Sequence, residues 1–462
     1  MNTVPKPDRS CSFVLPFLSH GKCGLLPVAA VLALLARFPA GPARAQDHPP
    51  CCSGTVQAED GLKKPSGPLQ FGPVKLGLEA LMRAETATNL SLGGFSFTPG
   101  SNEGRVLLRL RPSVTVSPSE NLTARVEGQW YAFYDDRDFS EFTLYQGFVE
   151  GTVPGAKKLS VKAGRQEFVY GSTFLLGADT FYDGLTFDAV KLSLKPSEKF
   201  AIDLFGGQYV KGLSGGIEGK IYGIYATYTP GETLSVDLYG FRDTGGAGDT
   251  HAGGDHEKTY SVGSRISGRI AKIVAVEVEP VYQFGRKGRA DDVSHNDISA
   301  YGGHVDVTVD PPLGRYPGKI FLSYAYGSGD GEPEKGKFTE FHNPNNDTSL
   351  IGDMNVIDEL GGLTVGNMTA SGLQVVTGGG GVDVTGKLNV SLDGHYFRAN
   401  KVPAGIRKEI GIETNLIFTY KIKESISVLL SGNRFFTGGF FKDASGSGKD
   451  ISYAYLQAQA TF

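Results

Sequence analysis

The chain has 462 residues, with 45 Lys and Arg against 49 Asp and Glu, a formal net charge of −4 and four cysteines. Cys11 and Cys23 fall in an expected signal peptide, and Cys51 and Cys52 are adjacent, which excludes a framework of disulfide bonds. We expect no cofactor, no metal site and no nucleic-acid partner.

The first 45 residues have the pattern of a secretory signal peptide. Basic residues precede an apolar run at 25–36, and Ala43-Arg-Ala45 follows as a cleavage signal. The apolar run is shorter than the roughly 20 residues that a membrane-spanning helix needs. We therefore expect a signal peptide at 1–45, a flexible periplasmic tail at 46–70 and one transmembrane domain at 71–462.

Segments in which apolar and polar residues alternate follow one another along the rest of the chain. We identify them at about 74–85, 104–116, 121–133, 141–153, 158–168, 184–194, 199–209, 220–229, 233–243, 258–270, 273–285, 297–309, 318–328, 369–385, 387–399, 407–420, 424–436 and 450–462. Most have the length of about 10–13 residues that a tilted strand needs to cross a bilayer. The fourteenth segment contains four glycines at 378–381, which weaken a strand.

Short turns with Pro and Gly alternate with longer, Gly-rich loops between these segments. This alternation is typical of outer-membrane barrels whose two termini lie in the periplasm. A chain without spanning helices can cross lipid only as a closed barrel, because every backbone group there needs a partner. We predict an all-β, antiparallel transmembrane barrel of 18 strands in the outer membrane of a Gram-negative cell, enclosing an aqueous channel.

The alternation of side chains also predicts which charged residues face the lumen. An arginine in lipid costs roughly 2–4 kcal/mol near the membrane centre, so we expect the arginines of these strands to point inward. The predicted basic residues of the lumen are Arg83, Arg105, Arg109, Arg111, Arg125 and Arg265. The predicted acidic residues are Asp203, Asp237, Glu277, Glu279, Asp306, Asp393 and Glu413. Opposed basic and acidic walls favour a channel for anionic or polyhydroxy solutes, although inward charges also solvate any porin lumen.

The sequence GRQEFVYGSTFLLG at 164–177, followed by TFDAVKL at 186–192, resembles the alginate export family. Similar segments at 145–150 and 324–330 extend the resemblance over most of about 75–462. The resemblance implies an 18-stranded outer-membrane barrel that exports an anionic exopolysaccharide passively through an arginine-rich constriction.

The same resemblance implies that Arg165 is a constriction arginine and that Asp188 is a lumen acid opposite to it. Side-chain alternation instead puts Arg165 on the face of Val161 and Ala163, and it puts Asp188 on an outward face too. A bulge at Gly164 would turn Arg165 towards the lumen. We expect both residues near the extracellular rim.

Three further segments carry expectations. The C-terminal strand ends at Phe462, which resembles the residue that the barrel-assembly machinery reads in outer-membrane proteins. The long, Gly-containing connection from Asp330 to Thr369 is a candidate gate over the pore. The aromatic residues at 130–134 are interpreted as part of the membrane-interface girdle rather than as a platform for sugars.

These features predict an outer-membrane channel for diffusion of anionic solutes, with export of an alginate-like anionic exopolysaccharide as the leading function. The alternative is a general or substrate-selective porin that takes up small hydrophilic solutes. Expected partners are outer-membrane lipid, the barrel-assembly machinery, periplasmic polysaccharide-secretion proteins and the solute itself. An enzyme is not expected, because His304 and His395 have no Ser partner nearby in sequence.

Overall fold

The computed structural model describes residues 70–135, 139–210, 219–244, 258–288, 295–312, 314, 316–332 and 336–462. The expected signal peptide and nearly all of the expected tail lie outside these residues. All of the described residues belong to one compact unit. Among the described residues, no helix has the length and apolar character needed to span a membrane.

Eighteen antiparallel strands form a closed wall in the described part of the chain. They are β2 (Val74–Ser91), β3 (Ser96–Ser119), β4 (Leu122–Tyr134), β5 (Phe139–Thr152), β6 (Leu159–Gln166), β7 (Phe187–Ser197), β8 (Phe200–Tyr209), β9 (Lys220–Gly231), β10 (Leu234–Asp243), β11 (Lys258–Ala271), β12 (Val274–Gly288), β13 (His295–Val309), β14 (Gly318–Gly327), β16 (Met368–Asp383), β17 (Leu388–Lys401), β18 (Glu409–Lys423), β19 (Ile426–Thr437) and β20 (Ile451–Thr461). The elements beside the wall are β1 (Gln70–Phe71), η1 (Ser349–Ile351), β15 (Gly362–Val365) and α2 (Gly439–Ser445).

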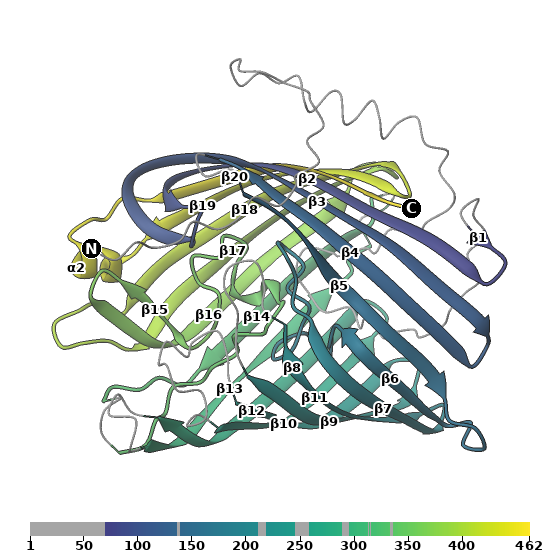
Figure 1. Ribbon diagram of the computed structural model, residues 1–462. Coiled ribbons are helices and arrows are strands. Elements are labelled where there is room, and N and C mark those ends of the chain that lie inside the picture. Colours follow the sequence, from purple (N-terminus) through teal and green to yellow (C-terminus); the bar gives the residue numbers. More distant parts are fainter. Residues whose placement is uncertain are drawn as a thin grey trace, which may run out of the picture. The chain divides into compact units, whose positions relative to one another are not determined.

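The barrel closes where the first wall strand meets the last. Purple β2 runs beside yellow β20 in Figure 1, with Glu79 opposite Thr461 and Thr88 opposite Ser452. The C-terminal residue Phe462 continues this pairing, because its backbone exchanges two hydrogen bonds with Leu78. The predicted barrel of 18 strands is confirmed, since every predicted segment overlaps one wall strand.

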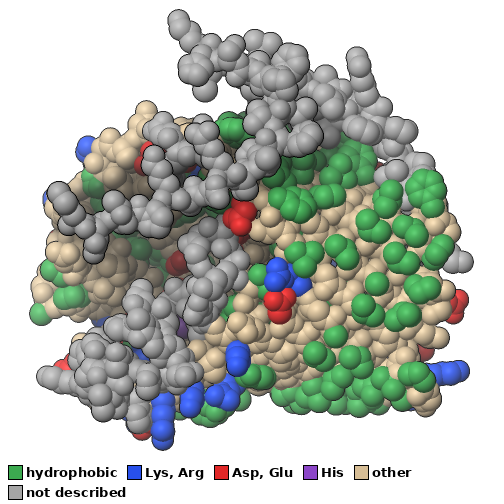
Figure 2. Space-filling view, viewed as in Figure 1, with side chains coloured by type: hydrophobic (Ala, Val, Ile, Leu, Met, Phe, Trp, Pro, Cys, Tyr) green, Lys and Arg blue, Asp and Glu red, His purple; other side chains and the backbone are tan. Residues whose placement is uncertain are grey.

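Side chains of the wall alternate between an apolar outer face and a polar or aromatic inner face. In β7, for example, Val190 and Leu192 are exposed on the outside, whereas Ala189 and Ser193 are buried. Figure 2 shows hydrophobic side chains spread over the outer face that is in view. A strand between lipid and a polar lumen requires this period of two, which is why the strands could be predicted.

The glycines at 378–381 lie within β16 and pair with β14 and β17. Gly379 faces the ring of Phe321, and a Cβ atom at Gly379 would lie only 2.7 Å from the ring atom Cζ. The aromatic ring therefore occupies the place of the missing side chain, and the predicted fourteenth strand is confirmed despite its glycines.

Two connections fold into the barrel. We call residues 167–186, between β6 and β7, the first inner loop, and residues 336–361, between β14 and β15, the second inner loop. Their backbones bond to each other, from Gly177 N to Asn345 O (2.8 Å) and from Asp347 N to Thr173 O (3.0 Å). The expectation that the segment after Asp330 folds over the pore agrees with this arrangement, and its role as a gate stays a prediction.

Candidate functional site

Four arginines lie side by side on the inner face of β2 and β3. We call Arg83, Arg105, Arg109 and Arg111 the arginine wall; their exposed fractions are 2, 7, 2 and 4%. Arg105, Arg109 and Arg111 share one face because they are separated by even numbers of residues, and Arg83 on β2 lies opposite Leu107. All four side chains are buried on the face that side-chain alternation assigns to the lumen, and their role in lining the solute path stays a prediction.

The first inner loop covers the arginine wall with its main chain. Arg109 Nη1 donates to the carbonyl oxygens of Thr180 (2.7 Å) and Tyr182 (2.5 Å). Arg83 donates to the carbonyl of residue 181 (3.0 Å), and Arg111 donates to that of residue 183 (3.1 Å). Carbonyl dipoles, rather than carboxylates, thus satisfy much of the wall's donor capacity.

Only part of the positive charge of the wall is paired within the described residues. Arg105 Nε lies 2.5 Å from Glu85 Oε2, and Arg109 Nη2 lies 2.6 Å from Glu79 Oε1. Arg83 shares Glu85 at 3.4 Å. Among the described residues these four arginines form ion pairs with only two carboxylates; the Glu167 carboxylate also attracts Arg111, and dipoles and aromatic rings balance the rest of the positive charge. The Arg109 Nε atom is buried without a hydrogen-bond partner.

Aromatic rings pack against these guanidinium groups. The Arg111 Cζ atom lies 3.6 Å from the centre of the Tyr145 ring, and Arg105 Cζ lies 4.4 Å from the centre of the Phe133 ring. Tyr131 is also buried, beside Phe133. The interpretation of residues 130–134 as an outer girdle is therefore wrong for Tyr131 and Phe133. Tyr131 and Phe133 are separated from the inward Arg125 by even numbers of residues, so the sequence already placed them on the inner face of β4.

Arg125 and Arg265 face the lumen as predicted but do not join the arginine wall. Arg125 lies near the start of β4 and forms an ion pair with Glu127, with a closest N–O distance of 3.1 Å. Arg265 on β11 lies between Asp237 (2.7 Å) and Glu277 (2.5 Å). Arg265 is therefore part of an acidic cluster on another side of the barrel.

Arg165 and Asp188 lie on the outer face, and the expectation that Gly164 turns Arg165 inward is wrong. The pairing of β6 with both neighbours continues through Gly164 without a shift in register. Arg165 donates to both carboxylate oxygens of Asp188, at 2.8 and 2.9 Å. This two-point ion pair lies near the ends of its strands, where charge on the outer face costs little.

The acidic residues Asp237, Glu277, Glu279 and Asp306 lie together on β10, β12 and β13, and we call them the acid wall. All four are buried inside the barrel, as predicted. β12 is the eleventh wall strand and β3 is the second, so 11 − 2 = 9 positions separate them in a barrel of 18. The acid wall therefore lies across the lumen from the arginine wall, and the effect of the two opposed walls on solutes stays a prediction.

The first inner loop spans the distance between the two walls. At one end, Ser172 Oγ lies 2.5 Å from Glu279 Oε2. At the other end, the Tyr182 hydroxyl donates to Glu85 Oε1 (2.9 Å). Sequence reasoning missed this loop. The available signal was its aromatic and apolar content between 168 and 182, which is unusual for a solvated loop.

The second inner loop is held by a third group of charges. Glu413 Oε1 on β18 accepts hydrogen bonds from the backbone N–H groups of Asp353 (2.6 Å) and Met354 (3.2 Å). Burial, together with the negative charge of Asp393, raises the pKa of the Asp353 carboxyl to about 7. In the first inner loop, burial and the negative charge of Asp347 raise the pKa of Asp179 to about 6.

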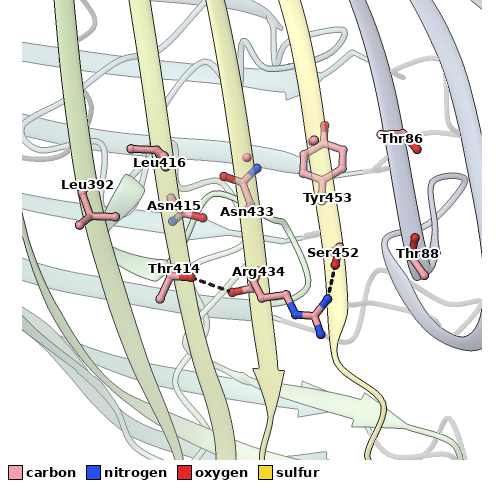
Figure 3. A pocket seen from close by; sticks show the side chains of 12 residues that line it. Thr86, Thr88, Leu392, Thr414, Asn415, Leu416, Asn433, Arg434, Ser452 and Tyr453 are labelled. Atoms are coloured by element: carbon pink, nitrogen blue, oxygen red, sulfur yellow. Dashed lines mark hydrogen bonds between the residues drawn. The ribbon is translucent and has the colours of Figure 1, made fainter.

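The outer face also carries a shallow groove, of about 320 Å³, near the closure of the barrel (Figure 3). Leu392, Leu416 and Thr86 line it, and the Arg434 guanidinium at its edge donates to Ser452 Oγ (2.5 Å). Leu392 and Leu416 are exposed on the side of the wall away from the lumen. This groove is therefore not part of the solute path.

A family model described as alginate export matches residues 73–352. No curated protein sequence matches the chain significantly. Similar solved structures include Pseudomonas aeruginosa OpdL (11% identity, TM-score 0.59, covering 85% of this chain and 99% of that chain). Others are Pseudomonas aeruginosa OccK11 (11%, TM-score 0.57, 84% and 96%) and Acinetobacter baumannii OccAB4 (11%, TM-score 0.55, 86% and 100%).

At such low identity, the likeness to the Occ and Opd outer-membrane porins concerns the fold alone. The family match is broader evidence, because it covers more than half of the chain. With the closed barrel, the apolar outer face and the charged lumen, it identifies this chain as a member of the alginate export family and an outer-membrane channel.

Proposed function

We propose that this channel lets anionic solutes diffuse across the outer membrane, and that its solute is an alginate-like anionic exopolysaccharide on its way out of the cell. The single observation that carries this proposal is the arginine wall. Its four guanidinium groups form ion pairs with only two carboxylates among the described residues, Arg109 Nε has no hydrogen-bond partner, and main-chain carbonyls of the covering loop accept from three of the four arginines.

A carboxylate is a better partner for a guanidinium than a carbonyl is. Arginine can bind a carboxylate with two parallel hydrogen bonds and is also attracted by its negative charge, which a neutral carbonyl lacks. The carboxylate of a sugar acid could therefore replace the carbonyls of residues 180–183 when the first inner loop moves. The loop would then act as an internal occupant that the solute displaces.

The spacing of the wall favours a polymer over a single small anion. Arg109 and Arg111 are two residues apart on β3, which places their Cα atoms about 7 Å apart. Arg105 extends the same row. A chain of carboxylates can contact several of these arginines at once and exchange them one at a time, so it is held without being trapped.

The second candidate is a porin for small hydrophilic solutes, and the two inner loops are the observation that favours it. They bond to each other inside the barrel and to both charged walls. If they stay in place, only small solutes can pass. Export of a polymer requires that the first inner loop be displaced, which separates the two candidates experimentally.

We also propose two kinds of protein partner. The barrel-assembly machinery would read the C-terminal strand β20 and Phe462, and periplasmic polysaccharide-secretion proteins would deliver the polymer. Both would act from the periplasmic side, where the short turns lie. The secretory signal peptide that would bring the chain to the periplasm is part of the same proposal.

The test is single-channel recording of the refolded barrel in a planar bilayer, with short polyuronate chains or neutral dextran of equal length added on one side. We expect transient blocks by polyuronate and none by dextran, and shorter blocks in Arg111→Gln. Arg125→Gln is the matched control, because this arginine also faces inward but lies outside the arginine wall. Equal behaviour of both polymers would favour the small-solute porin.

A further inference from the structure

Three potential metal ligands meet on the acid wall. Glu277 on β12 lies directly opposite Asp306 on β13, and His304 lies two residues away on the same face as Asp306. One ligand atom of each residue lies within 4.8 Å of the other two. All three side chains are buried inside the barrel, each with an exposed fraction of 3%.

Two carboxylate oxygens in this cluster have no partner. Glu277 Oε1 and Asp306 Oδ1 are buried and accept no hydrogen bond. A buried polar atom without a partner costs about 1–3 kcal/mol, and more when it is charged. Such atoms need an explanation, and two of them on directly opposed residues are groups that a positively charged ligand would satisfy.

The charges around the cluster are unbalanced as well. Four carboxylates, those of Asp237, Glu277, Glu279 and Asp306, surround a single guanidinium, that of Arg265. Even when His304 is counted as a cation, 4 − 2 = 2 negative charges remain. One divalent cation would balance this excess.

The surroundings already orient the three ligands. His304 Nδ1 faces Asp306 Oδ2 at 2.7 Å, and its other ring nitrogen, Nε2, faces Glu279 Oε2 at 3.3 Å. Metal-binding histidines usually donate their second ring N–H to a carboxylate in this way. Arg265 holds the Oε2 atom of Glu277 and leaves Oε1 free for another partner.

We propose that Glu277, His304 and Asp306 bind a divalent transition-metal ion of the Zn²⁺ type inside the barrel. An imidazole with two carboxylates suits such an ion, whereas Ca²⁺ and Mg²⁺ prefer oxygen ligands alone. The ion takes the place of the hydrogen bond between His304 and Asp306, and Glu279 orients the imidazole from behind. Solvent fills the remaining coordination positions.

A bound ion also acts on the first inner loop. Ser172 Oγ contacts Glu279 Oε2 and lies 3.2 Å from His304 Nε2. Fixing the imidazole therefore strengthens the contact between this loop and the acid wall. The site does not depend on the identity of the transported solute.

The experiment is calorimetric titration of Zn²⁺ into the refolded, chelator-treated barrel, with metal content measured on the same samples. We expect one strong site per chain in the unaltered protein and at least tenfold weaker binding in Glu277→Gln and His304→Gln. His395→Gln is the control, because His395 is an equally buried histidine beside a carboxylate, Asp393 (3.0 Å), but lies outside the cluster. It should bind Zn²⁺ like the unaltered protein.

Zn²⁺ should also raise the unfolding temperature of the unaltered protein and of His395→Gln, but not that of Glu277→Gln. If His304→Gln fails to fold, Glu277→Gln carries the test, because Gln keeps the shape of the side chain. Equal Zn²⁺ affinity in all variants, no strong site in the unaltered protein, or tighter binding of Ca²⁺ than of Zn²⁺ would overturn the proposal. The cluster would then be an imidazolium held between Asp306 and Glu279.

Discussion

The arginine wall and the acid wall face each other across one lumen, yet their charges are satisfied in different ways. On the arginine wall, main-chain carbonyls of residues 180–183 bind Arg83, Arg109 and Arg111. On the acid wall, a side chain of the barrel itself pairs with the charges, because Arg265 lies between the carboxylates of Asp237 and Glu277. The loop can move away from the arginines, whereas the strands that carry the partners of the acid wall are held in place by the barrel.

This difference suggests separate roles for the two walls. Partners supplied by a loop can be exchanged for a solute, so the arginine wall is suited to transient contact with anions. Partners supplied by adjacent strands stay in place, so the acid wall is suited to anchoring the first inner loop through Ser172.

Removal of the loop should have the largest effect. Replacing residues 174–184 by a short Gly-Ser linker takes away the carbonyls that cover the arginine wall. We expect a severalfold rise in single-channel conductance and stronger selectivity for anions, because the guanidinium groups then face water. Unchanged conductance in planar bilayers would mean that the loop does not restrict the channel.

Two arginines of the same wall should differ in their effect on stability. Arg105→Gln leaves Glu85 buried beside fewer positive charges, and losing one partner of a buried ion pair costs about 3–5 kcal/mol. Arg111→Gln breaks no direct ion pair within 4.0 Å, since the contacts of Arg111 with hydrogen-bond acceptors and rings are to Gln129, Tyr145 and a carbonyl, so we expect about 1–2 kcal/mol. Urea unfolding in lipid vesicles measures both, and equal losses would contradict the proposed pairing.

The docking of the inner loops should weaken as the pH rises. Burial raises the pKa of Asp179 to about 6, from 3.8. A raised pKa means that the docked loop prefers the protonated carboxyl, so stability is lost as the pH rises from about 4 through about 6. Asp353, whose pKa is raised to about 7, should act in the same direction over a slightly higher range.

We therefore expect more open channels at about pH 8 than at about pH 5, and a flat profile in the double variant Asp179→Asn/Asp353→Asn. Asp443→Asn serves as the control, because a hydrogen bond from Arg407 lowers the pKa of Asp443 to about 2, outside this range. A double variant with the full pH dependence would show that other groups control the loops.

The smallest effect is expected on the outer face. Replacing both Arg165 and Asp188 by Leu removes an ion pair near the strand ends, where charge costs only about 0–1 kcal/mol. We expect stability to change by about 1 kcal/mol or less, with unaltered ion selectivity. A change in selectivity would contradict the outward placement of this pair.

The strands and the arginine wall could be predicted because lipid imposes a period of two on every strand. Parity alone placed Arg105, Arg109 and Arg111 inside the barrel, and it also pointed to the outer position of Arg165, against the family resemblance. Asp188, 23 residues away, neutralises Arg165 there, and this pairing is what permits an arginine on the outer face.

The inner loops could not be derived in the same way. The first inner loop binds the arginine wall largely through main-chain carbonyls, which every residue has, so this part of its docking leaves no pattern of residue types. The unpartnered oxygens of Glu277 and Asp306 also depend on how β12 and β13 align, which the sequence does not state. Only the aromatic content of residues 168–182 hinted that this loop is buried.

The most direct test of the central claim is the reversal potential of the channel under a salt gradient, for the unaltered protein and for Arg83→Gln/Arg111→Gln. This double variant removes two positive charges from the wall and keeps the shorter ion pairs of Arg105 with Glu85 and of Arg109 with Glu79. We expect anion selectivity in the unaltered protein and its loss in the variant. Cation selectivity in the unaltered protein, or an identical reversal potential in both, would contradict this expectation.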